Sequence, residues 1–85
     1  MISKNEIKRI RSLHQKKGRK EAHQYIIEGE KSVREAMASD SEIVALYVLD
    51  SASQDILEQG DLISEKEMKQ ISAFTSFSPA LAIIK

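Results

Sequence analysis

Hydrophobic and polar positions at the start of the chain follow the spacing of an amphipathic helix. Ile7, Ile10 and then Leu13 or His14 recur at helical spacing and would form one apolar stripe. Ser3 precedes this stripe as a candidate N-cap, and Glu6 stands three residues later at the capping-box position. We therefore predict a first helix that begins after Ser3.

Farther along, short apolar runs alternate with helical patterns. The expected strands are 25–28, 43–49, 62–63 and 80–84. The expected helices after the first are 30–39, 51–59 and one that begins after Ser64, with Glu67 at its capping-box position; 75–79 is expected to be a loop. The run 43–49 is apolar on both faces, so we expect it to be a central strand. Strands that alternate with helices predict an α/β fold with a mostly parallel sheet and helices on both faces.

The charges are divided along the chain although the formal net charge is zero. Residues 1–34 hold ten Lys and Arg against four acidic residues, a net charge of +6. Residues 35–85 hold three Lys against nine acidic residues, a net charge of −6. Such a division favours a polyanion-binding face in the first part of the chain.

The basic residues themselves are grouped. Lys4, Lys8 and Arg11 share one face of the first helix, and the run Lys16-Lys17-Gly18-Arg19-Lys20 follows, where Gly18 is expected to interrupt or bend the helix. Like charges four residues apart destabilise a helix slightly. A solvated helix face is the plainer interpretation, but the density of this group favours phosphate contacts, and hence nucleic acid.

Catalytic motifs are not recognisable. The three glycines stand alone, so no phosphate-binding loop is visible. His14 and His23 lack the spacing of metal ligands, and a packing or solvated role is favoured for both. Glu28 and Glu30 lie at a strand-to-helix junction, where helix capping is favoured over acid–base chemistry. The residues alone therefore predict no active site.

The composition indicates which cellular compartment to expect. The sequence has no cysteine, which excludes disulfides and thiolate sites and fits a reducing compartment. The apolar runs are shorter than the about 18 residues needed to span a bilayer. No apolar stretch follows the first charges, so the N-terminus does not have the pattern of a secretory signal. We expect a cytoplasmic protein without membrane contact.

The order of these features resembles SpoU/TrmH-type RNA 2′-O-ribose methyltransferases. The stretches 7–20, 25–31 and 33–36 are similar to the start of their N-terminal substrate-binding domain, with its helix, Lys-Lys-x-Arg, aromatic-aliphatic strand, Glu-Gly and second helix. The resemblance continues to 78–84 and so covers nearly the whole chain. Two departures are His23, where glycine is common, and Ser78-Pro79-Ala80, which replaces the usual Thr-Pro-Gln-Gly.

This resemblance implies a three-layer α/β/α sandwich like that of ribosomal proteins and kink-turn binders, with a basic N-terminal helix. It implies that residues 1–85 form one substrate-binding domain for ribosomal or transfer RNA, without metal, cofactor or catalysis of its own. In the family, a separate knotted C-terminal domain binds S-adenosylmethionine, transfers the methyl group and forms the homodimer; none of its motifs is present here. The parent protein is therefore expected to be an S-adenosylmethionine-dependent RNA methyltransferase.

The resemblance also carries residue predictions. The implied RNA contacts are Lys8, Arg9, Arg11, Lys16, Lys17, Arg19 and Lys20, with Lys4, Lys31 and Arg34 as further candidates. Tyr25 and Tyr47 are expected in the core, while Phe74 and Phe77 are the better candidates for stacking on bases, although packing is favoured for them too. Two alternatives stay open: a free-standing ribosomal or kink-turn-type RNA-binding protein, and an interaction module whose oppositely charged halves bind head to tail.

Overall fold

Helices and strands alternate through residues 2–73 and 78–85, which are the residues that the computed structural model describes. The helices are α1 (Lys4–Ser12), α2 (Lys16–Ala22), α3 (Glu30–Ala38), α4 (Gln54–Leu57) and α5 (Glu65–Ile71). The strands are β1 (Tyr25–Glu28), β2 (Ile43–Val48), β3 (Asp61–Leu62) and β4 (Ala80–Ile84). The loop expected at 75–79 and the two phenylalanines of that region, Phe74 and Phe77, lie largely or wholly outside the described residues.

The four strands form one mixed sheet in the order β1-β4-β2-β3. Strand β4 is antiparallel to both of its neighbours, and only β2 and β3 pair in parallel. The expectation of a mostly parallel sheet was therefore wrong. Alternation of strands and helices does not set strand direction, because a connection can return the chain to either end of a sheet. Here Ala80, at the start of β4, pairs with Val48, at the end of β2.

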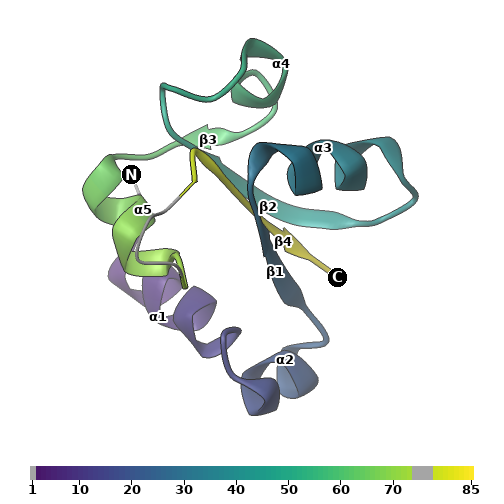
Figure 1. The fold of residues 1–85 in the computed structure, drawn as a ribbon. Helices are drawn as coiled ribbons and strands as arrows, with labels where there is room; N and C mark the ends of the chain where they lie inside the picture. The colour runs from purple at the N-terminus through teal and green to yellow at the C-terminus, as the bar shows by residue number, and fades with distance from the viewer. Residues whose placement is uncertain (1, 74–77) are drawn as a thin grey trace.

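Helices cover both faces of the sheet, and β4 shows why (Figure 1). Leu81 and Ile83 join a hydrophobic cluster with residues of α1 and α5. Ala82 and Ile84 point the other way and join a cluster with residues of α3 and α4. Because successive strand residues face opposite sides, a fully buried strand must be apolar throughout, as β4 is. The three-layer α/β/α sandwich is thus confirmed.

Strand β2 is central, as expected, but it carries an irregularity. The pairing with β4 shifts between Ile43 and Ala45, which leaves Val44 as an extra residue that is 41% exposed. This is the behaviour of a β-bulge. Tyr47, later in the same strand, is buried as predicted. Tyr25 is not: it begins the edge strand β1 and remains 45% exposed, so its assignment to the core was wrong.

Side-chain caps that the sequence predicts mark the starts of α1 and α5. The capping box of Ser64 and Glu67 is formed at the start of α5, because each side chain accepts the other residue's backbone N–H. At α1 only half of the predicted box exists, since Ser3 accepts from the Glu6 amide while the Glu6 carboxylate binds Arg9. The helix expected at 51–59 shortens to α4, and the strand expected at 62–63 lies one residue earlier, as β3. Within the described residues no helix is long and apolar enough to cross a bilayer.

Candidate nucleic-acid interface

Helices α1 and α2 form the part of the molecule that holds most of the predicted RNA contacts. In α1, Ile10 is buried against α5 and the sheet, whereas Lys4, Lys8 and Arg11 are exposed. In α2 no residue is buried, so the helix presents its side chains to solvent. An amphipathic helix thus anchors a second helix that contributes almost nothing to the core.

Gly18 fixes how α2 meets α1. The expected interruption lies instead at residues 13–15, between the two helices, and Gly18 is inside α2. A Cβ atom at this position would lie 2.0 Å from the Ser12 carbonyl oxygen at the end of α1. Only glycine allows the two backbones to approach this closely. The residue is therefore a packing requirement, and α2 is held directly beside the end of α1.

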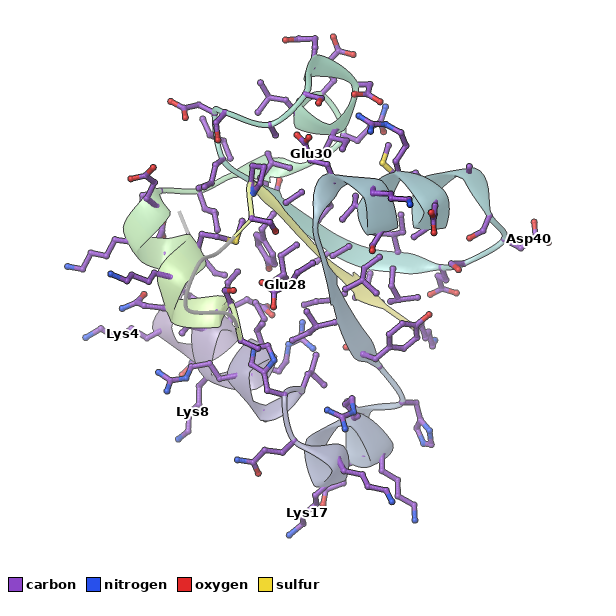
Figure 2. The ribbon with its side chains drawn as sticks, in the orientation of Figure 1. Lys4, Lys8, Lys17, Glu28, Glu30 and Asp40 are labelled. Atoms are coloured by element: carbon purple, nitrogen blue, oxygen red, sulfur yellow. The ribbon has the colours of Figure 1, made fainter. Side chains whose placement is uncertain are left out.

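The lysines of α1 and α2 are available to a partner. Lys16, Lys17 and Lys20 are exposed and form no ion pair or hydrogen bond with any described residue. Figure 2 shows Lys4, Lys8 and Lys17 pointing outward on the side formed by α1 and α2, while Asp40 lies on the opposite side of the molecule. We call Lys4, Lys8, Arg11, Lys16, Lys17 and Lys20 the N-terminal basic surface.

Two of the predicted contacts are engaged within the chain. The Arg9 guanidinium lies 2.6 Å from the Glu6 carboxylate and also donates to the Gln24 side chain at 3.0 Å. Arg19 donates to the Leu13 carbonyl oxygen at 3.2 Å. Arg9 thereby links α1 to the segment before β1, and Arg19 links α2 to the turn that precedes it. Both arginines stabilise the arrangement of the basic surface, which leaves fewer of their donors for phosphate.

The two remaining candidates are remote from this surface. Lys31 and Arg34 belong to α3, on the other face of the sheet. Arg34 donates two hydrogen bonds to the Asp55 carboxylate, both at 3.1 Å, and so joins α3 to α4. Hydrogen bonding and charge attraction raise the pKa of Arg34 and lower the pKa of Asp55. The sheet separates this ion pair from α1 and α2.

Two lysines from the acidic part of the chain join the site, and sequence reasoning missed them. Lys66 and Lys69 of α5 line a shallow groove together with Lys8 and Arg11 of α1. We call it the α1–α5 groove. The two pairs of residues are more than 50 positions apart in the sequence, so only the packing of α1 on α5 reveals their proximity. A weaker signal was present, because Lys66 and Lys69 share one face of a helix that was correctly predicted.

The histidines and the two glutamates of the β1–α3 junction have structural partners. His14 bonds the Ile71 carbonyl oxygen through Nε2 at 2.6 Å, and His23 adopts the left-handed conformation with φ 56°. Glycine adopts that conformation most easily, which fits the glycine that the resemblance leads us to expect at this position.

Glu28 accepts hydrogen bonds from the Ser72 hydroxyl and the Ala73 amide, and Glu30 accepts from the Ser53 amide and hydroxyl. Both carboxylates therefore tie loops to the sandwich: Glu28 fixes the end of α5, and Glu30 fixes the start of α4. Figure 2 shows them pointing to different parts of the molecule. Among the described residues, no three His, Asp or Glu side chains are grouped as metal ligands would be.

Three solved structures that are similar to this chain are described as RNA methyltransferases. A protein assigned to the TrmH family of RNA methyltransferases from Porphyromonas gingivalis matches with a TM-score of 0.80 and 26% identity, over 100% of this chain and 36% of its own. An rRNA methyltransferase from Sinorhizobium meliloti matches with a TM-score of 0.79 and 23% identity, over 100% of this chain and 35% of its own. An RNA 2′-O ribose methyltransferase matches with a TM-score of 0.78 and 20% identity, over 98% and 35%.

The chain thus spans about a third of the length of these solved relatives. The sequence has no match among curated proteins. The family described as the MRM3-like substrate binding domain matches residues 4–79. Because this match takes in most of the sequence, it confirms the resemblance to the substrate-binding domain of SpoU/TrmH-type enzymes. The chain belongs to the family of MRM3-like substrate binding domains.

Proposed function

We propose that this domain holds the RNA substrate of an S-adenosylmethionine-dependent 2′-O-ribose methyltransferase by contacts between the N-terminal basic surface and RNA phosphates. Ribosomal RNA is the substrate class that we infer, since one solved relative is described as an rRNA methyltransferase. Methyl transfer, cofactor binding and dimerisation are assigned to a catalytic domain outside these 85 residues. The proposed location is the cytoplasm.

One observation carries the proposal: six exposed cations lie along α1 and α2 without acidic partners among the described residues. Repulsion between such charges destabilises the folded chain, and a polyanion would remove that repulsion. Phosphate contacts by Lys and Arg also release counterions, which favours binding at low salt. Because phosphates occur at every nucleotide, these contacts would position the RNA and leave the choice of nucleotide to other parts of the enzyme.

Replacement of Lys16 and Lys20 by alanine tests the proposal. Both side chains are exposed and form no ion pair or hydrogen bond with a described residue, so their removal should leave the fold intact. The slope of log affinity against log salt is negative, and each lost phosphate contact makes it shallower by about 0.7 to 0.9. We expect the double variant to bind an rRNA fragment more weakly at low salt and to lose roughly 1.5 from that slope. Fluorescence anisotropy with a labelled rRNA fragment, measured across a salt series, gives both quantities.

A matched control removes the same charge from other elements. Lys31 lies on α3, and Lys85 lies beyond β4, where its Nζ is 4.0 Å from the Glu42 carboxylate. Replacement of Lys31 and Lys85 by alanine should leave the slope close to that of the wild-type chain. Equal slopes for the wild type and for the variant of Lys16 and Lys20 would overturn the proposal, as would absence of RNA binding by the wild-type chain.

A further inference from the structure

The α1–α5 groove combines four cations from two helices that are distant in sequence. Lys8 and Arg11 form one wall, Lys66 and Lys69 form the other, and the polar side chains of Gln15 and Gln70 also line it. Each of the four cations is exposed. The acidic part of the chain therefore contributes two of its three lysines to the same site as the basic part.

Hydrogen bonds fix both ends of the helix pair. At the start, the Ile2 amide donates to the Glu67 carboxylate at 2.9 Å, which joins the beginning of α1 to the first turn of α5. At the end, His14 Nε2 lies 2.6 Å from the Ile71 carbonyl oxygen. Since a carbonyl oxygen can only accept, His14 carries its hydrogen on Nε2. The two helices are thus pinned at both ends, which fixes the spacing of the walls.

Packing beneath the groove adds to this rigidity. Ile10 of α1 and Met68 of α5 are fully buried in the same hydrophobic cluster. The groove therefore lies over a packed core, and its width does not depend on exposed side chains alone. A site that is already formed loses less conformational entropy when a ligand binds.

The acidic residues nearest to these cations in sequence do not neutralise them. Glu6 of α1 is paired with Arg9, and Glu67 accepts from the backbone amides of Ser64 and Ile2. Glu65, beside Lys66 and four residues before Lys69, is exposed and forms no ion pair with a described residue. Within the described part of the chain, the side chains of the four groove cations form no ion pair or hydrogen bond. Four unpaired cations on two fixed helices repel one another, so the groove is complementary to an extended anion.

The character of the lining favours RNA over an acidic protein. The described residues that line the groove are all charged or polar, and among them are none of the exposed aromatic or aliphatic anchors that carry most of the energy at protein interfaces. Interfaces with nucleic acid are, by contrast, polar and positively charged. Amide side chains such as those of Gln15 and Gln70 can bond phosphate oxygens or ribose hydroxyls.

We propose that the α1–α5 groove binds the sugar–phosphate backbone of the RNA, with Lys66 and Lys69 forming the wall that faces Lys8 and Arg11. This inference rests on the proposed function and adds to it a defined path for the strand. The backbone runs between α1 and α5, and α2 extends the positive surface beyond the groove. The two lysines of α5 are therefore RNA contacts even though the sequence around them is acidic.

Two double variants and one control test the inference with the complete 85-residue chain and the labelled rRNA fragment. Replacement of Lys66 and Lys69 by alanine should lower the slope of log affinity against log salt by roughly 1.5, as should replacement of Lys8 and Arg11. The variant of Lys31 and Lys85 removes the same charge outside the groove and should stay near wild type. Circular dichroism shows whether each variant retains its fold, and arginine at positions 66 and 69 should restore binding.

The outcomes separate this inference from the proposed function. In one outcome, the variant of Lys66 and Lys69 binds RNA as the control does while that of Lys8 and Arg11 binds weakly. This result would contradict RNA binding in the α1–α5 groove and leave RNA binding by the N-terminal basic surface supported. If the wild-type chain does not bind RNA, both fail. Competition by poly-glutamate as effective as that by RNA, at equal charge concentration, would reassign the groove to an acidic protein partner.

Discussion

Gly18 is the residue on which the position of α2 depends most directly. Its backbone lies so close to Ser12 that a methyl group would overlap the carbonyl oxygen. Alanine is ordinarily better than glycine inside a helix by about 1 kcal/mol, but a clash with backbone atoms costs about 1–3 kcal/mol. The clash should outweigh the gain, because the atom that must move belongs to the end of α1 and not to a mobile side chain.

Replacement of Gly18 by alanine should therefore lower the free energy of unfolding by up to about 2 kcal/mol, measured by urea denaturation. Lys17, the exposed neighbour in the same helix, provides the matched control. Alanine at position 17 should change stability little, since the two residues have similar helix propensities. An unfolding free energy for the Gly18 variant above that of wild type would show that α1 and α2 are not packed as described.

Single residues also show where prediction from the sequence ends. Arg9 was predicted to contact RNA, and in the structure it is exposed but paired with Glu6, which lies three positions earlier and within reach of sequence reasoning. The contact of Arg19 with the Leu13 carbonyl depends on the turn between α1 and α2, which the helical pattern does not specify. A partner three or four residues away in the same helix can be predicted from the sequence. A partner on the other side of the connection between two helices cannot.

At the scale of elements, Glu67 joins α5 to the start of α1. Its carboxylate accepts backbone hydrogen bonds from Ser64 and Ile2, and these bonds lower the pKa of Glu67 from its ordinary value of 4.5. A carboxylate whose pKa is lowered in the folded state stabilises the fold at pH values above the pKa that it has in the unfolded state. That contribution is lost as the pH falls through the lower, folded-state pKa.

Replacement of Glu67 by glutamine removes the charge and keeps one acceptor oxygen. We expect the variant to unfold more easily than wild type at pH 7, and the difference to shrink at pH values below 4.5, where the wild-type carboxylate becomes protonated. Urea denaturation at a series of pH values measures this. Glutamine at Glu65, an exposed position of the same helix without a hydrogen bond to another described residue, is the control. A stability difference independent of pH would contradict the account of Glu67.

Elements could be predicted from the sequence where their signals are local. The strand at 25–28 follows from a short apolar run, and the caps at Ser3 and Ser64 follow from capping patterns within a few residues. The direction of β4 could not be predicted, because it depends on how the chain returns after α5. The bulge at Val44 could not be predicted for a similar reason. It is a property of the pairing between β2 and β4, and a continuous apolar run is compatible with a regular strand or a bulged one.

For the whole molecule, the division of charge along the sequence becomes a division in space, with exceptions that matter. Most of the predicted contacts lie on α1 and α2, and the structure places Lys31 and Arg34 on the far face of the sheet. The fold also brings Lys66 and Lys69 from the acidic part to α1. Net charge per segment therefore points to α1 and α2, the helices of the proposed interface, but the set of residues in the groove depends on tertiary packing.

The central proposal is that RNA contacts the side of the molecule formed by α1, α2 and α5, and not the side formed by α3 and α4. Titration of the isotope-labelled chain with an rRNA fragment, followed by the backbone amide NMR spectrum, tests it directly. We predict that the largest shifts fall in residues 4–22 and 65–71 and decrease as salt is added. Shifts centred on α3 and α4, or shifts unaffected by salt, would contradict the account.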